Sequence, residues 1–478
     1  MTAAATTADR NDTAFLGHPK ALGYLAFTEA WERFSYYGMQ TLLVLYMIHQ
    51  LLLPGHVENV AGFTWLKALL DPVGLKSNQQ IASAIFGWYA GLVYLTPILG
   101  GFIADRLLGR TRTIVTGALL MALGHFLMAF DVSFLIALLC LMLGSGCFKG
   151  NIATQVGHLY PETDNRRADA FQIFYLAINA GVIVTPLIVG TLGEKVGWHY
   201  GFGAAGLGML VSIAIYLAGR KHLPPDPPLG ANQRAADKAA RPPMTGRDWK
   251  KLALLIVMLP VLTASIVGNQ EIFNAYLVWV ERSADLRLFG MPILTTWMVS
   301  VDSIVSVACL AGMVVFWRWW KTKFKEPDEL GKIAIGCAFG AAGVLALVAG
   351  AAIAEATGTK VAFGWLFLFH LLNDIGFANV LPVGLALYAR SSPRAIAGTV
   401  VGIYYLHLFA GNLLVGNVLG ARLETMTGTA FWLMHAVLVG GACIAILVIK
   451  ALFGRIFTGE EDTPSEEDVA TADAVKAP

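Results

Sequence analysis

The chain has 478 residues, of which 56% are hydrophobic and only 14% are charged. Soluble globular chains carry about 25% charged residues, so this composition excludes an ordinary soluble domain and indicates a chain that folds in lipid. The formal net charge of +2 is too small to indicate nucleic-acid binding. The five cysteines lie inside apolar runs without metal-ligand spacing, so we expect neither a disulfide framework nor a metal site.

Both ends of the chain are polar. Residues 1–20 contain no apolar stretch typical of a cleavable signal, so we expect a cytoplasmic N-terminal segment and a first span that directs its own insertion. Residues 458–478 are acidic and lack aromatic side chains, which is typical of a disordered cytoplasmic tail.

Twelve stretches are long and apolar enough for a membrane span, which needs about 20 residues. They are residues 21–52, 80–105, 112–131, 133–157, 168–193, 200–221, 250–280, 292–320, 331–356, 360–390, 394–422 and 429–456. Residues 223–248 are rich in proline, alanine and charge, which predicts a solvated linker. We therefore expect an all-α polytopic membrane protein with six-helix bundles over 21–222 and 249–457.

The basic residues predict the orientation. Of the 34 Lys and Arg, seven fall on the side opposite the linker and two fall inside spans, which leaves 25 on the linker side. The positive-inside rule places the linker and both termini in the cytoplasm. We expect a multi-pass protein of the cell inner membrane that is surrounded by lipid and acts as a monomer.

The first span carries a polar stripe. Glu29, Glu32 and Arg33 are spaced i, i+3, i+4 and share one helix face, which Tyr36 and Tyr37 continue. A charge at mid-membrane costs at least about 2.5–3.5 kcal/mol, so it has to be paired or face water. Since Arg33 is expected to neutralise one carboxylate at a time, the other is a candidate for proton exchange. The alternative is a salt bridge that only packs helices.

Two later spans of this half also carry polar side chains. Lys149 lies among small residues that allow helices to approach closely, so it is expected to face a cavity or a carboxylate. The alternative is a lysine that extends to the membrane surface. Tyr175 and Asn179 are spaced i, i+4, and Asn179 either lines a cavity or bonds a neighbouring helix.

The second half has three acids inside apolar spans, Glu271, Asp302 and Asp374, and none has a local basic partner. We expect them to pair across a central cavity with Arg33 or Lys149; the alternative is a polar packing contact. Gly376 and Pro382 follow Asp374 and are expected to weaken that helix, as suits a moving gate.

This charge layout predicts a zwitterionic ligand. Cationic groups belong to the N-terminal half and unpaired acids to the C-terminal half, so a solute with a carboxylate and an ammonium group would bridge them. Five aromatic residues are candidates for a wall that tolerates different side chains. They are Tyr36, Tyr37, Tyr94, Trp297 and Tyr404.

Four motifs resemble one family. ExxERFxYYG in the first span (Glu29 to Gly38), GGFIADRLLGR after the second, GSGCFKGN around Lys149 and FYLAINAG in the fifth span are similar to signatures of the proton-dependent oligopeptide transporters, a branch of the major facilitator superfamily. The resemblance implies a major facilitator fold with two six-helix bundles around a central cavity. It also implies an alternating-access, proton-coupled symporter that imports di- and tripeptides.

The resemblance also implies residue roles. Arg33 and Lys149 match positions that meet the peptide carboxylate, Glu29, Glu32 and Arg33 match proton-coupling positions, and Asp105 and Arg106 match the cytoplasmic gate. Four residues match peptide-lining positions: Tyr36, Tyr37, Tyr94 and Asn179.

The C-terminal half departs more from the family. Glu271 lies near the position of a seventh-span acid and is assigned to proton coupling, while Asp302 replaces an asparagine. Phe377 stands where the family has a glutamate, and Asp374 lies one turn earlier. Tyr404 corresponds to a tryptophan. We assign Asp302, Asp374 and Tyr404 to substrate binding.

Two alternatives to a peptide symporter stay open. The departures at Phe377 and Asp302 favour a relative that moves another small polar solute, such as a modified amino acid or an anion. The other alternative, from a different class, is a non-transporting sensor or membrane-embedded enzyme. The sequence has no nucleophile motif, phosphate loop or metal-ligand pair, and the histidines His49, His125, His370, His407 and His435 are scattered. We therefore expect no catalytic activity and no cofactor other than the coupling proton.

Overall fold

The computed structural model describes residues 12–161, 164, 166–226, 228–230, 244–288, 290–393 and 396–458. The expected tail (458–478), except Thr458, and the central part of the expected linker lie outside the described residues.

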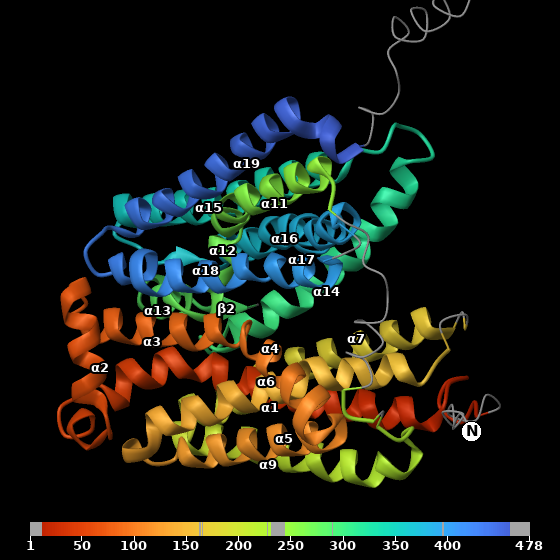
Figure 1. Ribbon diagram of the computed structural model, residues 1–478. Helices are drawn as coiled ribbons and strands as arrows, with labels where there is room; N and C mark the ends of the chain where they lie inside the picture. The colour runs from red at the N-terminus through yellow and green to blue at the C-terminus, as the bar shows by residue number, and fades with distance from the viewer. Residues whose placement is uncertain are drawn as a thin grey trace, which may run out of the picture.

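The N-terminal half is a bundle of helices, drawn from red to yellow-green in Figure 1. Its longer helices are α1 (Lys20–Tyr46), α3 (Asn78–Leu92), α4 (Thr96–Ile103), α5 (Arg110–Leu127), α6 (Phe134–His158), α7 (Arg166–Thr185) and α9 (Trp198–Gly219). Short helical segments extend or join them: η1 (Met47–Leu51), η2 (Val57–Asn59), α2 (Phe63–Leu70), η3 (Asp71–Val73), η4 (Ala104–Leu108), η5 (Asp131–Ser133), η6 (Pro186–Gly190), α8 (Thr191–Lys195) and η7 (Arg220–His222).

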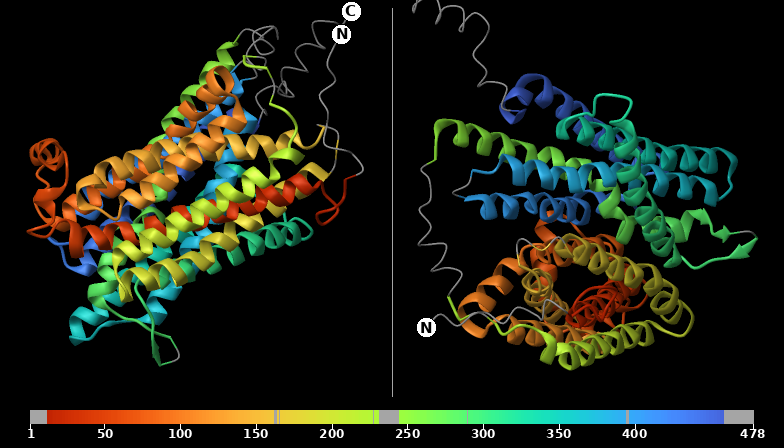
Figure 2. Two further views of the ribbon diagram at one scale, coloured as in Figure 1. Left: turned by 90° about the horizontal axis from the view of Figure 1, so that it is seen from below. Right: turned by 90° about the vertical axis from the view of Figure 1, so that its right-hand side faces the viewer.

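The C-terminal half, from green to blue, packs on the first as a second bundle (Figures 1 and 2). Its helices are α11 (Gly246–Ser265), α12 (Val267–Gln270), η8 (Glu271–Phe273), α13 (Ala275–Ser283), α14 (Trp297–Trp320), α15 (Glu329–Thr357), α16 (Phe363–Ser391), α17 (Ala397–Tyr404), α18 (Leu406–Leu414), η10 (Val415–Leu419), η11 (Gly420–Arg422) and α19 (Gly428–Thr458). Four two-residue strands lie in its loops: β1 (Ala284–Asp285) pairs in parallel with β4 (Val361–Ala362), and β2 (Arg287–Leu288) pairs antiparallel with β3 (Met291–Pro292).

The helices overlap all twelve expected spans. Among the described residues nine are long and apolar enough to cross a membrane by themselves, and α11 with α12–η8, bent by 51°, makes a tenth. The two remaining helices, α1 and α5, carry charged side chains, including the Glu29–Arg33 stripe and Arg110, which lower their hydropathy. This is the arrangement of two six-helix bundles that the sequence predicts.

Helix ends follow local sequence rules. Ser77 starts α3 with a capping box, in which its hydroxyl accepts from the Gln80 amide while the Gln80 side chain accepts from the Ser77 amide. Thr245 and Asp248 form the same motif at the start of α11. Between η4 and α5 the chain turns at Gly109, whose φ of 79° suits glycine.

Glycine pairs allow close helix packing within each half. A Cβ on Gly117 of α5 would lie 2.6 Å from the Gly144 carbonyl of α6, and a Cβ on Gly376 of α16 would lie 2.7 Å from the Gly336 carbonyl of α15. Helix α16 continues through Gly376 and Pro382. Gly376 also serves a close contact with α15, and the expectation that Gly376 and Pro382 weaken this helix stays a prediction.

The two halves contact each other at the end of the molecule opposite the linker. The Glu194 carboxylate accepts from the Thr296 amide at 2.8 Å, and the Trp297 indole donates to the Thr191 hydroxyl at 2.9 Å. On the same side, the side-chain amide of Gln79 donates to the Gly420 carbonyl at 2.9 Å. The bundles are therefore closed together at this end.

At the linker end an open cleft of about 1090 Å³ lies between α7 of the first half and α14 and α16 of the second. It is lined by Tyr175 and Asn179 of α7, by residues of α14 including Trp317 and by residues of α16 including Pro382. A structure closed at one end and hollow at the other is the expected form of an alternating-access carrier in one of its two states.

Candidate functional site

The acidic and basic residues of α1 form a buried cluster. The Arg33 guanidinium donates to one oxygen of Glu29, with distances of 2.6 Å from Nη2 and 2.9 Å from Nε. Arg33 Nε also lies 3.1 Å from a Glu32 oxygen. Arg33 therefore contacts both acids, although its single positive charge can balance only one of them. Glu32 nevertheless accepts no hydrogen bond from the part of the chain that the structure describes.

Lys149 joins this cluster from the neighbouring helix α6. Its ammonium lies 3.5 Å from the centroid of the Tyr36 ring, and it interacts electrostatically with Arg33, Glu29 and Glu32. Arg33 lies 6.0 Å from the same ring. Two cations thus lie near one aromatic ring between α1 and α6, and Arg33 is also paired with both acids of α1, so Lys149 does not extend to the membrane surface.

Tyr37 and Tyr94 lie where the two halves meet. The Tyr37 ring packs against Phe273 of η8, with centroids 5.8 Å apart. Tyr94 packs against apolar residues of the second half. Both tyrosines are part-buried, so each presents some surface to the space between the bundles.

Asn179 lines the cleft at the linker end. Its side-chain amide donates to the Tyr175 carbonyl one turn earlier at 2.8 Å, so it bonds within its own helix and does not bond a neighbouring one. Of the two alternatives left open by the spacing, the structure favours the cavity.

The acids of the second half have partners that the sequence did not reveal. The Glu271 carboxylate lies 3.0 Å from His435 Nε2 and accepts from the Ala275 amide at 3.1 Å. Asp302 lies 2.8 Å from His370 Nδ1. The expected pairing of these acids with Arg33 or Lys149 is therefore wrong in this conformation: imidazoles of the same bundle take that place.

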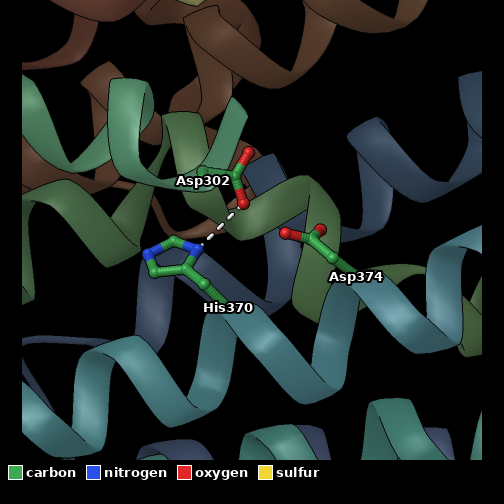
Figure 3. A group of neighbouring side chains, drawn as sticks. All are labelled: Asp302, His370 and Asp374. Carbon is green, nitrogen blue, oxygen red and sulfur yellow. Dashed lines mark hydrogen bonds and ion pairs between the residues drawn. The ribbon is translucent and has the colours of Figure 1, made fainter. Parts of the chain in front are cut away.

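Asp374 lies beside the Asp302–His370 pair. It is 1% exposed, and neither of its carboxylate oxygens accepts a hydrogen bond from a described residue. The ligand atoms of Asp302, His370 and Asp374 all lie within 4.8 Å of one another (Figure 3). Reading the histidines as scattered missed this group, although the i, i+4 spacing of His370 and Asp374 was visible in the sequence.

Tyr404 does not line the space between the bundles. Its side chain is fully buried, its ring packs 5.0 Å from that of Tyr388, and its hydroxyl donates to the Leu381 carbonyl at 2.7 Å. The neighbouring Tyr405 is 37% exposed. The assignment of Tyr404 to substrate binding is corrected accordingly: the structure gives it a packing role within the second bundle.

The expected gate residues lie at the linker end of the first bundle. Asp105 forms an ion pair with Arg110 at 3.5 Å, and Arg106 packs over the Phe102 ring at 5.0 Å. Asp226 accepts from both the amide and the hydroxyl of Thr111 beside them, at 2.8 and 3.0 Å. Asp226 comes from the start of the expected linker, and no motif in the sequence points to this contact.

The arrangement as a whole divides charge between the two bundles. The first presents Arg33 and Lys149 around Tyr36, and the second presents Asp302, which keeps 12% of its side chain exposed. Tyr37 lies at the boundary, where its ring packs against Phe273 of the second bundle. Such a site suits a small solute that carries opposite charges at its two ends, together with a proton on one of the buried carboxylates.

The chain is similar in sequence to known transporters. Residues 111–241 match the protein-family model described as POT family. The peptide transporter YePEPT of Yersinia enterocolitica is 29% identical, over 91% of this chain and 94% of its own. A di-/tripeptide transporter of Lactococcus lactis is 34% identical, over 68% of this chain and 57% of its own.

A solved structure has the same fold. The crystal structure of the peptide transporter POT in complex with sulfate superposes with a TM-score of 0.78 at 24% identity, and the match covers 93% of this chain and 96% of that one. The major facilitator arrangement expected from the sequence is thereby confirmed.

Proposed function

We propose that this chain, which belongs to the POT family, is a proton-coupled symporter that imports di- and tripeptides by alternating access. The observation that carries the proposal is the buried cluster in which Arg33 pairs with Glu29 and Glu32 and lies, together with Lys149, near the Tyr36 ring. These groups supply a carboxylate-binding site and a proton-exchanging acid within one cluster. The names of the relatives supply the class of solute.

The peptide is held by its two ends in this proposal. Its carboxylate meets Arg33 and Lys149, and its ammonium group meets the exposed oxygen of Asp302 across the boundary between the bundles. The rings of Tyr36, Tyr37 and Tyr94 contact the side chains in between. An aromatic wall tolerates many side chains because dispersion contacts do not need a particular polar partner.

The proton is carried by Glu32. Glu29 accepts two hydrogen bonds from Arg33. Glu32 forms an ion pair with Arg33 but accepts no hydrogen bond from it. A peptide carboxylate that engages Arg33 weakens the hold on Glu32, whose charged form then has no partner, and proton uptake neutralises it. We propose Glu271 and His435 as a further proton-exchanging pair in the second bundle.

Orientation, location and assembly complete the proposal. The positive-inside distribution of Lys and Arg places the linker end, with its 1090 Å³ cleft, on the cytoplasmic side of the inner membrane. The structure then corresponds to a state open toward the cytoplasm. The chain acts as a monomer in lipid, with no cofactor other than the proton and no catalytic activity.

Uptake into liposomes tests the function. Purified protein is reconstituted, a proton gradient directed inward is imposed, and uptake of labelled dialanine is compared with that in empty liposomes and without a gradient. We expect uptake above equilibrium only with the gradient. If no di- or tripeptide accumulates with the gradient, the proposal is wrong.

The second bundle gives a reason to test another class of solute. Phe377 stands where related transporters carry a glutamate, and His370 holds one oxygen of Asp302. Both features reduce the acidic contacts available to a peptide ammonium group. Amino acid derivatives that are shorter than a dipeptide therefore belong in the same uptake assay, and saturable accumulation of one of these, without any of a peptide, would identify the alternative.

A further inference from the structure

Three side chains converge inside the second bundle, apart from the cluster on α1. Asp302 comes from α14, while His370 and Asp374 come from α16. Figure 3 shows all three pointing toward one another. Because His370 and Asp374 are spaced i, i+4, they lie on one face of α16, and that face is turned toward Asp302.

The group is short of positive charge. Asp302 and Asp374 are 8% and 1% exposed, and no Lys or Arg of the described chain forms an ion pair with either. Both oxygens of Asp374 are buried, and neither accepts a hydrogen bond of normal geometry from a residue that the structure describes. Two carboxylates that face each other in a dry interior are unfavourable unless a cation lies between them.

The His370 ring is oriented by a contact on its second nitrogen. Its Nε2 lies 2.8 Å from the hydroxyl of Tyr276, a residue of α13 that is itself fully buried, and this contact turns Nδ1 toward the two carboxylates. An outer hydrogen bond of this kind on the second ring nitrogen is what orients metal-ligating histidines. The ring is thus positioned as a ligand before any cation arrives.

We propose that Asp302, His370 and Asp374 bind a divalent transition-metal cation, with Zn²⁺ the ion that fits best. One imidazole nitrogen and two carboxylates are donors that Zn²⁺ accepts, whereas Mg²⁺ and Ca²⁺ prefer oxygen alone. A divalent cation balances two carboxylates and a neutral imidazole, while a single proton leaves one negative charge.

The spacing of the donors is compatible with such an ion. Zinc bonds of about 2.0–2.2 Å place tetrahedral donors roughly 3.4 Å apart. The donors here lie within 4.8 Å of one another, so the widest pair has to close by at most roughly 1.5 Å, while His370 Nδ1 and the Asp302 oxygen, 2.8 Å apart, have to open by roughly 0.6 Å; small side-chain rotations allow both. Three protein ligands leave a fourth position open for water. Because zinc would neutralise Asp302, the metal-bound state and the state in which Asp302 meets a peptide ammonium group are alternatives.

Metal binding by the full-length protein tests the site. The protein in detergent is stripped with a chelator, dialysed, and titrated with Zn²⁺ by calorimetry, and the bound metal is counted by mass spectrometry. Cobalt(II) serves as a spectroscopic probe, because nitrogen and oxygen ligands at low coordination number give visible absorption bands. We expect one equivalent of zinc per chain and a rise in the melting temperature when it binds.

Three variants locate the site. Asp374→Asn and His370→Gln each remove one donor and should weaken zinc binding by more than about tenfold. The matched control is Glu271→Gln, which alters the other buried carboxylate–imidazole pair of this bundle and should leave zinc binding unchanged.

Each outcome decides the question. Absence of stoichiometric binding to the wild-type chain overturns the proposal, whether or not the variants fold. Binding that survives in both Asp374→Asn and His370→Gln also overturns it. If the triad holds only protons, the wild-type chain would bind no zinc. In that case the melting temperature of the wild-type chain would depend on pH, and this dependence would differ in the Asp374→Asn variant. The test does not depend on which solute is transported.

Discussion

The Lys149 ammonium on α6 lies 3.5 Å from the centroid of the Tyr36 ring on α1. This contact joins the two helices that carry the cationic side of the site, and it places Lys149 beside Arg33, which lies 6.0 Å from the same ring. Since both cations would repel each other without an intervening group, the electron-rich face of Tyr36 stabilises their approach.

The ring face, and not the hydroxyl, should therefore matter at this position. Tyr36→Phe keeps the face, and we expect peptide affinity to stay within about threefold. Tyr36→Leu removes a buried cation–π contact worth about 1–2 kcal/mol and should weaken peptide binding by about tenfold. Calorimetric titration with a dipeptide measures both. Equal losses in the two variants would show that the hydroxyl, and not the ring face, carries the effect.

Glu32 and Glu29 should differ in what their loss removes. Glu32 accepts no hydrogen bond from a described residue, so Glu32→Gln should abolish gradient-driven uptake while peptide counterflow continues. Glu29 holds the Arg33 guanidinium through contacts of 2.6 and 2.9 Å, so Glu29→Gln should misplace Arg33 and reduce both activities. Uptake and counterflow in the same liposomes separate the two roles. Loss of counterflow in Glu32→Gln would give Glu32 a binding or folding role instead.

The α1 cluster could be predicted because it depends on one helix. Glu29, Glu32 and Arg33 share a face in any α-helix, so their spacing was enough to bring them together. The family resemblance then supplied Lys149 from another helix. Neither source required knowledge of how helices are rotated against each other.

The contacts in the second half could not be predicted in this way. Asp302 meets His370, and Glu271 meets His435, only because of how α14, α16 and α19 are turned about their own axes. In a soluble protein the apolar face of a helix indicates that rotation, but these helices have apolar residues on most of their surface and only a few polar ones to mark a side. The same reason applies to Tyr404: the residues next to it in the sequence do not indicate that its side chain points into the second bundle.

The closed end should depend on Glu194. Its carboxylate accepts from the Thr296 amide across the boundary between the bundles at 2.8 Å. This bond is part-exposed, so Glu194→Ala should shift the balance toward opening at that end by about 1 kcal/mol, or roughly fivefold. Spin labels on the ends of α8 and α14 would report the change as a larger fraction of long distances. Lys195→Ala is the matched control, because Lys195 is exposed; a similar shift there would contradict the assignment to Glu194.

Stability should depend on the contact between α15 and α16. A Cβ on Gly376 would lie 2.7 Å from the Gly336 carbonyl and 2.8 Å from the Gly340 amide nitrogen, and backbone atoms cannot move aside as a flexible side chain does. We expect Gly376→Ala to destabilise the protein by about 1–3 kcal/mol, as overpacking does, and to lower its melting temperature. Gly364 lies on the same helix, and a Cβ there meets nothing within 4 Å, so Gly364→Ala should leave the melting temperature unchanged or raise it slightly. Thermal unfolding in detergent compares the two, and equal melting temperatures would show that α15 and α16 can separate at this point without cost.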